Sequence, residues 1–436
     1  MTARRVAVIG GGWAGLAAAI EATSLGARVS LFEMAPQLGG RARSVESDSL
    51  VLDNGQHIMI GAYVETLRMM RMVGVDIDAA FLRSPLRLLD AQGHGLALPA
   101  GQPMIAFARG VLALRGWPLR HRFSLLAMAS GWMLQGFRCA AGLTVAQLVR
   151  RLPTTVRDEL IEPLCVAALN TPARLASAQV FLRVIRDALF SGRGSADLLL
   201  PRQRLSELLP APAQRWLKSA GASIELGRRV GRVEADGTAW RIDGESFDAV
   251  IIACSAAEAS RLAATIDAAW SAQAGALGYE PIVTVYAQSD GTRLPEPMLA
   301  LPSDEDARPA QFVFDHGQLG GRDGLLAFVI SGAAPWIDRG AAATRDAVLA
   351  QAQALLAPHL QSPLTEVRSL TEKRATFRCT PGLVRPRSAI ANDLFAAGDY
   401  IEGPYPATIE GAVRSGIAAA RAAVSGAQTA PPAARR

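Results

Sequence analysis

The sequence contains few cysteines, and no two of them are close together. Its 436 residues include only four, which form no CxxC pair. This scarcity excludes a disulfide framework and a cysteine-based metal cluster. The chain also enters an apolar, strand-like run within its first residues, so we expect no cleaved signal peptide and a location in the reducing cytoplasm. The four are Cys139, Cys165, Cys254 and Cys379.

Histidine and concentrated positive charge are equally scarce. The five histidines are widely separated, so we expect no metal site. The net charge is only +6, and the basic residues are scattered without the runs that nucleic-acid-binding proteins show. We therefore expect no nucleic-acid partner, whereas a modest basic excess suits an anionic cofactor or an anionic membrane surface.

No apolar run is long enough to cross a membrane, although one segment comes near. Met104–Ala141 is markedly apolar and contains five arginines, and its longest uncharged run, between Arg122 and Arg138, covers fifteen residues. A transmembrane helix needs about 20 apolar residues. The segment is therefore either a buried helix pair or an interfacial element whose arginines reach lipid headgroups.

What the sequence does contain is a strand–turn–helix–strand pattern at its start. Arg4–Ile9 is a β-type run that leads directly into the glycine turn Gly10–Gly15. An alanine- and leucine-rich helical segment, Leu16–Leu25, follows, and Arg28–Phe32 is a second β-type run that ends at Glu33. A glycine turn between two strands, with an acid about 20 residues further on, is typical of dinucleotide-binding βαβ units.

The residue types in this turn have separate physical reasons. Gly10 permits the tight turn out of the strand, Gly12 allows a pyrophosphate to approach the backbone, and Gly15 lets the helix pack closely on the sheet. The first N–H groups of the helix attract phosphate, and Glu33 can accept hydrogen bonds from ribose hydroxyls. We expect dinucleotide binding here, and the alternative is a βαβ unit without a ligand.

Two polar segments follow this unit. The loop after the acid contains Gly39, Gly40 and Arg41, which can fold over a ligand and neutralise phosphate, although an ordinary surface loop is the alternative. Asp53–His57 is a polar cluster between apolar runs. It is good hairpin-turn chemistry, and its position leaves it available to face a cofactor.

The middle of the chain predicts both helices and strands. We expect helices over about residues 58–73 and 156–170, and a strand over 246–254 that ends in the apolar run DAVIIAC. Three further β-type runs are expected to form one sheet of a second domain. They cover residues 281–288, 311–315 and 325–331.

A second glycine–acid pair lies near the other end of the chain. Gly398 and Asp399 follow a β-type run, and Pro406 precedes a predicted helix over 407–423. The carboxylate can bind ribityl hydroxyls, and the first N–H groups of this helix can stabilise negative charge on a reduced flavin ring. Two such junctions bracketing the chain favour one long dinucleotide, FAD rather than NAD. The alternative is a junction without a ligand.

The chain resembles the FAD-dependent amine oxidase and phytoene desaturase superfamily along its whole length. The stretch DNGQHIMIGAY and the closing motif are most similar to the squalene-associated branch, the hydroxysqualene dehydroxylases. The motifs that carry the resemblance are GGGWAGLAAAIEATSLGARVSLFE, GGRARS, LVLDNGQHIMIG, RCTPGLVRPRS and LFAAGDYIEGPYPATIEGAVRSG.

This resemblance implies an α/β fold with an α+β substrate lobe. A Rossmann-like FAD domain of the amine oxidase type would contain an inserted substrate-binding domain with apolar, membrane-facing helices. The expected FAD domain is discontinuous and comprises residues 1–75, 204–270 and 385–425. The substrate-binding domain would comprise 76–203 and 271–384, and 426–436 would be a flexible tail.

The resemblance also implies site residues by matching position. FAD is expected to be non-covalent, because no cysteine follows Cys379, whereas amine oxidases often carry a flavin-tethering cysteine near the C-terminal motif. Val230 would meet the adenine through its backbone, and Gln56 and His57 would lie near the isoalloxazine. The residues expected to hold the ADP half are Gly10, Gly12, Gly15, Glu33, Gly40 and Arg41. Those expected at the ribityl and flavin end are Gly398, Asp399, Thr408 and Ile409.

The squalene-associated branch implies a reductive reaction on a long apolar isoprenoid. Hydroxysqualene, an allylic alcohol, would lose water to leave a delocalised cation, and reduced flavin would deliver hydride to it. The acid for the leaving hydroxyl would be His57, Glu402 or Tyr405. Tyr405 can instead stabilise the cation through its ring, and Glu402 can be an ordinary exposed turn residue. An unidentified electron donor would reduce the flavin, and the insoluble substrate implies peripheral contact with the inner membrane.

Two other functions stay open at this point. A carotenoid-type desaturase or a flavin amine oxidase would use the same cofactor motifs to oxidise its substrate. A non-enzymatic prenyl-lipid-binding relative, similar to the prenyl-Rab escort proteins, would have a degraded phosphate turn. The intact turn and its acid argue against that last function.

Overall fold

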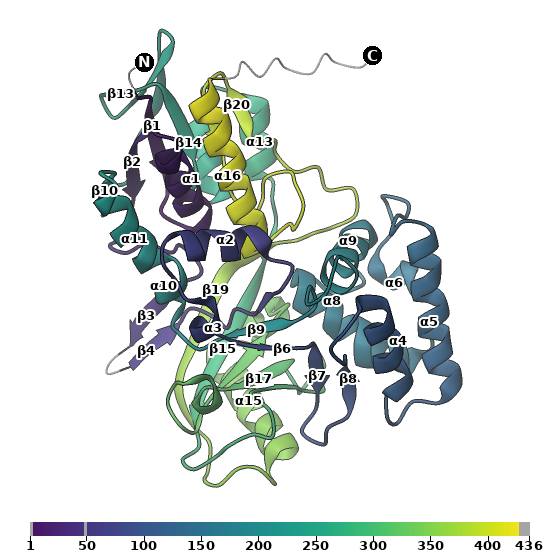
Figure 1. Ribbon diagram of the computed structural model, residues 1–436. Helices are drawn as coiled ribbons and strands as arrows, with labels where there is room; N and C mark the ends of the chain where they lie inside the picture. Colours follow the sequence, from purple (N-terminus) through teal and green to yellow (C-terminus); the bar gives the residue numbers. More distant parts are fainter. Residues whose placement is uncertain (1–2, 48–49, 427–436) are drawn as a thin grey trace.

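The computed structural model describes residues 3–47 and 50–426, which form two regions of mixed helix and strand (Figure 1). One region contains a six-stranded sheet, and the other contains a five-stranded sheet with a cluster of helices beside it. The chain passes back and forth between the two regions, so each is built from separated segments. Apart from Gly426, the tail predicted for residues 426–436 lies outside the described residues.

The six-stranded sheet has the order β10-β2-β1-β14-β21-β20, and all neighbouring strands are parallel except β20 and β21. In this order β1 lies between β2 and β14, and the chain continues from β1 to β2 on one side only. The carboxyl ends of β1 and β14 therefore flank a switch point, where open α/β sheets bind ligands. The strands are β1 (Arg5–Ile9), β2 (Arg28–Glu33), β10 (Ser223–Leu226), β14 (Ala249–Ile252), β20 (Ala389–Ala391) and β21 (Leu394–Ala396).

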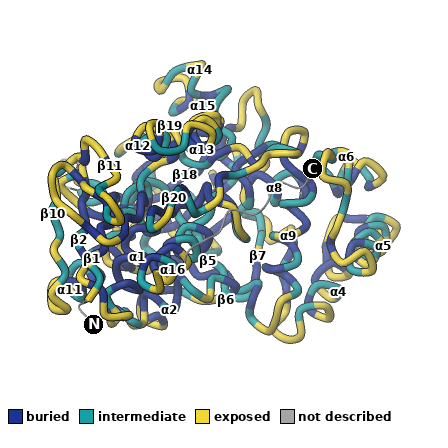
Figure 2. Tube along the Cα trace, turned by 90° about the horizontal axis from the view of Figure 1, so that it is seen from above, coloured by how far each residue is buried: buried dark blue, intermediate teal, exposed yellow. Residues whose placement is uncertain are grey.

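Helices cover one face of this sheet, and α1 (Trp13–Ser24) and α16 (Ile409–Ser425) lie side by side there (Figures 1 and 2). They approach closely because Gly416 has no side chain, and a Cβ there would lie 2.1 Å from the carbonyl oxygen of Ala14. The same core includes α2 (Val64–Met72), α10 (Leu205–Leu208) and α11 (Pro210–Ser219). The opposite face packs against β11 (Val233–Asp236), β12 (Ala239–Ile242), β13 (Glu245–Phe247), α12 (Ala256–Ala263) and α13 (Ala268–Gly275).

The five-stranded sheet is antiparallel, with the order β16-β17-β18-β15-β19. The prediction that three β-type runs share this sheet is confirmed, since they form β15, β17 and β18. One face packs on α15, and the other faces the helical cluster. The elements are β15 (Tyr279–Gln288), β16 (Met298–Ala300), β17 (Phe312–Asp315), β18 (Leu325–Ile330), β19 (Thr365–Phe377), α14 (Ala334–Arg339), α15 (Ala341–Leu356) and the short 3-10 helix Gly317–Leu319.

The helical cluster lies at the end of the molecule farthest from α11 (Figure 2). Three small sheets complete the structure. The helices of this cluster are α4 (Pro103–Ala113), α5 (Leu119–Leu134), α6 (Val145–Leu148), α7 (Thr154–Val156), α8 (Glu162–Leu169) and α9 (Ala178–Leu189). The short α3 (Ile77–Ala80) instead packs in the core beside the six-stranded sheet. The small sheets comprise β3 (Ser44–Ser47) with β4 (Leu50–Asp53), β5 (Met59–Ile60) with β9 (Leu198–Pro201) and β6 (Phe81–Ser84), and β7 (Arg87–Leu89) with β8 (Gly95–Ala97).

Three predicted elements differ from the structure. The helix expected from residue 58 begins only at Val64, because Met59–Ile60 pairs with β9 as a strand, and periodicity does not distinguish the two for so short a run. The strand expected over 246–254 is divided at Asp248, whose carboxylate accepts a hydrogen bond from the Arg5 N–H. The helix expected over 156–170 is interrupted by a π-helical turn before α8, where Pro163 lacks the N–H that a regular helix needs.

Candidate functional site

The glycine turn between β1 and α1 is tightly packed everywhere except at Gly12. A Cβ at Gly15 would lie 1.8 Å from the Gly10 carbonyl oxygen, and one at Gly10 would lie 2.7 Å from the Ala253 carbonyl oxygen. These two glycines are therefore required by the protein's own packing. Gly12 has an ordinary extended backbone, and the nearest atom to a Cβ there is the Cα of Gly40, at 3.8 Å. The missing side chain leaves space at the start of α1, which fits the approach of a phosphate.

Glu33 lies at the end of β2 and holds the turn from the other side. Its carboxylate accepts hydrogen bonds from the Gly11 N–H at 2.6 Å and the Ala35 N–H at 2.7 Å, and the residue is buried. A carboxylate has about four acceptor positions. The Gly11 and Ala35 N–H groups use two of these acceptor positions and fix the side chain. The two remaining acceptor positions fit ribose hydroxyls.

Arg41 connects the two ends of the chain. Its loop lies against the glycine turn, with the Gly39 N–H donating to the Gly11 carbonyl at 2.8 Å. The Arg41 guanidinium forms an ion pair with Asp399 at 2.6 Å and donates to the Ala375 carbonyl at 2.5 Å. The loop beside the glycine turn and the C-terminal acid are thus joined directly, an arrangement that fits one long ligand contacting both.

The C-terminal glycine–acid pair is fixed by α16. The Gly398 N–H donates to Ser415 Oγ at 2.8 Å, and that hydroxyl contacts the Gly398 carbonyl at 2.9 Å. A Cβ at Gly398 would lie 2.4 Å from the ring of Tyr400. The hydroxyl of Tyr400 is buried with no partner among the described residues, and burial raises its pKa well above the ordinary value. A buried donor without a partner beside Asp399 fits a polar ligand.

The segment before α16 has an unusual backbone. Tyr405 and Ala407, on either side of Pro406, have φ values of +58° and +57°, a region that favours glycine. The Ala407 N–H donates to the Asp399 carbonyl at 3.2 Å. Thr408 caps the helix by accepting from the Gly411 N–H at 3.0 Å. These contacts fix the first turn of α16, including the Ile409 N–H, next to Asp399.

Val230, expected at the adenine, is buried between β10 and β11 in the sequence. Its carbonyl already accepts a hydrogen bond from Arg261 at 2.8 Å. Because a carbonyl has two lone pairs, one acceptor position remains for a base.

The Asp53–His57 segment forms a turn against β19 and β15. Asn54 donates to the Arg41 carbonyl at 3.0 Å and to Glu372 at 3.2 Å, so this turn is bonded to the loop that carries Arg41 and to β19. Burial, together with the nearby Arg41 charge, lowers the pKa of His57, so its imidazole is neutral at pH 7. Its Nδ1 lies 3.2 Å from the Gly55 carbonyl. A neutral ring that donates from Nδ1 presents Nε2 as an acceptor. The Gln56 side-chain oxygen is buried without a partner among the described residues.

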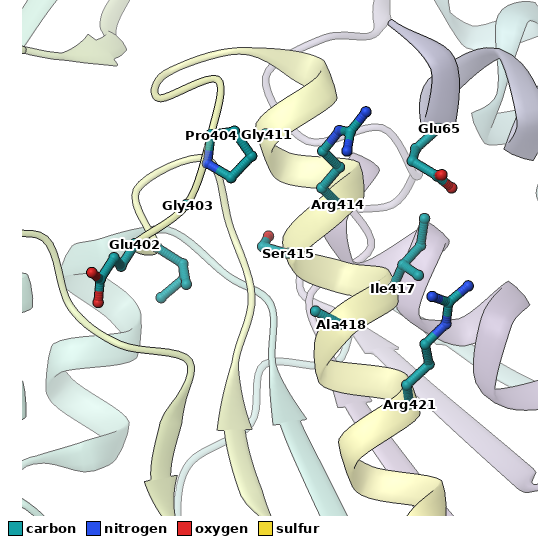
Figure 3. Close-up of a pocket in the computed structure, with 11 residues that line it drawn as sticks. Glu65, Glu402, Gly403, Pro404, Gly411, Arg414, Ser415, Ile417, Ala418 and Arg421 are labelled. Atoms are coloured by element: carbon teal, nitrogen blue, oxygen red, sulfur yellow. The ribbon is translucent and has the colours of Figure 1, made fainter. Parts of the chain in front are cut away.

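The other two acid candidates have different surroundings. Tyr405 is half-buried, its ring meets Tyr63 edge to face at 6.2 Å, and the Arg414 guanidinium lies 5.2 Å from its centroid. Burial raises the pKa of Tyr405. Glu402 is exposed and lines an open cleft of about 300 Å³ beside α16, where its carboxylate points away from that helix (Figure 3).

Two polar residues at this site were not predicted. Tyr400 directly follows the glycine–acid pair, and its position was a usable signal. Thr284, on β15, has a buried hydroxyl without a partner among the described residues. A threonine in a strand is ordinary β-chemistry, so nothing in the sequence distinguished it.

Comparisons with known proteins give one consistent family. The family model described as flavin containing amine oxidoreductase matches residues 13–424. The hydroxysqualene dehydroxylase of Rhodopseudomonas palustris is 27% identical over 454 residues, covering 96% of this chain and 97% of that protein. A probable zeta-carotene desaturase of Synechococcus elongatus is 24% identical, covering 96% and 98%. The solved cyclohexylamine oxidase of Brevibacterium oxydans has the same fold, with a TM-score of 0.70 at 16% identity over 97% of this chain and 99% of that chain.

Proposed function

Because the chain belongs to the flavin-containing amine oxidoreductase family, we propose that it is an FAD-dependent dehydroxylase that converts hydroxysqualene to squalene. The observation that carries this proposal is the match to a hydroxysqualene dehydroxylase over nearly the full length of both proteins. The open position at Gly12 supports it, because a lipid carrier without flavin has no use for a phosphate turn.

FAD would lie across the switch point of the six-stranded sheet. The ADP half would meet Gly12, Glu33 and the Gly40 backbone, and the ribityl and flavin end would meet Asp399 and the first turn of α16. Arg41 would hold the two sides together and add positive charge near the pyrophosphate. We expect non-covalent binding, since no cysteine follows Cys379 in the sequence.

In the reaction, the carbon–oxygen bond of the allylic alcohol breaks and a carbon–hydrogen bond forms. Reduced FAD would supply the hydride, and the hydroxyl leaves as water after taking one proton. The protein must therefore shelter a cation from solvent and supply that proton. Of His57 and Tyr405, His57 in its protonated form is the stronger acid, because burial lowers its pKa and raises that of Tyr405. The Tyr405 ring already faces a cation, that of Arg414.

The direct test is anaerobic reoxidation of the flavin. The purified holoenzyme, photoreduced without excess reductant, should regain its oxidised visible spectrum when hydroxysqualene is added, and squalene should form in equal amount. Squalene added instead of the alcohol should leave the flavin reduced, because it has no leaving group. If hydroxysqualene also leaves the flavin reduced, the dehydroxylase proposal is wrong.

A desaturase activity is the second candidate, supported by the full-length match to a probable zeta-carotene desaturase. Such an enzyme would oxidise its substrate, so electrons would move in the opposite direction. Oxidised enzyme mixed anaerobically with a partly saturated carotene would then bleach. This outcome, together with no reaction of the alcohol, would favour the desaturase.

The substrate would reach the enzyme from an anionic membrane surface through the α4–α5 hairpin. No Asp or Glu occurs between Asp90 and Asp158, whereas eight arginines do. Within the described residues, no helix is long and apolar enough to span a bilayer. Contact would therefore be peripheral, with arginines near anionic headgroups each contributing roughly 1 kcal/mol.

Helix α5 exposes an apolar stripe that suits such contact. Leu119, Phe123 and Leu134 are 61%, 58% and 90% exposed, and their spacing places them on one side of the helix. Leu125 and Trp132, on the opposite side, are buried against the protein core. The neighbouring α4 adds exposed Met104, Ile105 and Leu112.

Flotation with liposomes tests this surface. The wild-type protein should float with anionic vesicles and much less with neutral ones, and the double variant Phe123→Asp with Leu134→Asp should lose flotation. Leu25→Asp, an exposed leucine of the other region, is the matched control and should float like wild type. Equal flotation of the double variant and the control would contradict membrane docking through α5.

A further inference from the structure

Thr284 carries a hydroxyl group that the fold itself does not use. The residue lies in the middle of β15, is 1% exposed, and its Oγ1 has no hydrogen-bond partner among the described residues. Valine has the same shape and would fill the position without leaving a polar group unpaired. The hydroxyl is therefore a sign of an interaction with something other than the folded chain.

The other polar side chains on this face of β15 each form at least one hydrogen bond or ion pair with the protein. Side chains alternate along a strand, so Glu280, Tyr286 and Gln288 share a face with Thr284. Glu280 pairs with Arg378 at 2.7 Å, Tyr286 donates to the Asp53 carbonyl at 2.9 Å, and Gln288 donates to the Asp323 carbonyl at 2.9 Å. Ile282, between Glu280 and Thr284, packs on the apolar core. Among the described residues, Gln288 Oε1 on this face also has no partner, but it is an acceptor whose amide group is already bonded. The Thr284 hydroxyl is the donor on this face whose proton has no partner in the described part of the chain.

The Thr284 hydroxyl and the His57 ring both border the space that a Cβ at Gly55 would fill, which is called the recess below. Gly55 has φ +90° and no side chain, and a Cβ built there would lie 3.5 Å from His57 Cε1 and 3.9 Å from Thr284 Oγ1. The Cε1–Nδ1 edge of the imidazole and the Thr284 hydroxyl therefore border the same space, which the missing Gly55 side chain leaves open. His57 contacts the Gly55 carbonyl through Nδ1, so in its neutral form Nε2 is an acceptor.

We propose that Thr284 binds the hydroxyl group of the substrate, with His57 as the complementary acceptor. This inference rests on the proposed function, since it assigns the part of the site that recognises an alcohol. An alcohol has one donor and two acceptor positions. In the binding complex it accepts the Thr284 proton and donates to neutral His57 Nε2, so both unused positions are satisfied at once. Once His57 takes up a proton, its Nε2 instead donates to the same oxygen, as loss of water requires. Thr284 acts here as a specificity-determining residue.

This arrangement distinguishes the substrate from its product. Squalene has the same carbon chain but no hydroxyl, and leaves Thr284 unpaired again. A site that hydrogen-bonds a substrate hydroxyl rejects the analogue that lacks it. The recess therefore favours binding of the alcohol and release of the hydrocarbon after the carbon–oxygen bond is broken.

The test compares two ligands on two variants of the oxidised holoenzyme. Hydroxysqualene and squalene are titrated in detergent, and binding is followed by perturbation of the flavin spectrum. In Thr284→Val the affinity for hydroxysqualene should fall roughly tenfold, the value of one neutral hydrogen bond, while the affinity for squalene stays unchanged. Thr284→Ser keeps the hydroxyl and should restore the preference for the alcohol.

A purely structural role would give a different pattern. Thr284→Val would then unfold at a lower temperature and would bind both ligands more weakly by the same factor. If the hydroxyl is unpaired in the free protein, its loss should instead leave the unfolding temperature equal or higher. Two outcomes would overturn the proposal. One is an unchanged ratio of the two affinities in Thr284→Val, and the other is a wild-type enzyme that binds the alcohol no more tightly than squalene. Wild-type enzyme that prefers the alcohol but does not turn it over would sink the dehydroxylase function and support the recess.

Discussion

Replacing Gly12 by alanine should give a folded protein that no longer retains FAD. The backbone of Gly12 is compatible with any residue, and its new methyl group would meet only the Gly40 Cα, at 3.8 Å. In the proposed site, the same methyl would occupy the space through which the pyrophosphate reaches the first N–H groups of α1. Losing two charge-assisted hydrogen bonds there weakens FAD binding by about a hundredfold or more. The purified variant should be colourless.

The control for this experiment is another glycine of the same turn. Gly15→Ala places a Cβ 1.8 Å from the Gly10 carbonyl oxygen, so it should destabilise the fold itself rather than the cofactor alone. Thermal unfolding of the apoproteins distinguishes the two. Gly12→Ala should unfold near wild-type apoprotein and gain no stability from added FAD, whereas Gly15→Ala should unfold at a clearly lower temperature. A yellow Gly12→Ala protein with wild-type flavin content would show that the phosphates bind elsewhere.

The parts of this site that could be predicted from the sequence are those that local chemistry determines. The β1–α1–β2 unit was predictable because its strands, glycines and acid lie within the first 33 residues, each at a spacing that phosphate binding requires. The junction at Asp399 was predictable for the same reason. The discontinuous division into domains was an inference from family resemblance, and its boundaries stay a prediction.

Contacts between distant segments were not predictable from these patterns. The Arg41–Asp399 ion pair joins residues 358 positions apart, and it exists because β1 and β21 flank β14 in one sheet. The same holds for Thr284, which lies beside Gly55 only because β15 runs past the Asp53–His57 turn. Predictions from short apolar runs were also wrong in places. Met59–Ile60 was predicted as helix but is a strand, because β9 is available to pair with it.

Removing the carboxylate of Glu410 should cause the largest loss of stability of any single side-chain change near the site. Glu410 is fully buried on α16 and accepts from the Glu65 N–H at 3.1 Å, the Thr66 N–H at 2.9 Å, the Thr66 hydroxyl at 2.7 Å and Arg414 at 2.6 Å. It therefore caps α2 from another helix, since Tyr63 at the start of α2 provides no side-chain cap. Breaking such a buried pair costs about 3–5 kcal/mol.

Glu410→Ala should accordingly lower the unfolding temperature by several degrees and weaken FAD retention, because α2 fixes the helix whose first turn lies beside Asp399. The loss of stability should be near the lower end of the range of about 3–5 kcal/mol. The reason is that Arg414 is 34% exposed, so water can partly solvate its freed charge. Glu296→Ala is the matched control, because it breaks the similarly short but exposed Arg87–Glu296 pair and should cost under about 1 kcal/mol. Equal unfolding temperatures for the two variants would mean that α2 is held to α16 by apolar packing alone, and the start of α16 would then need another anchor.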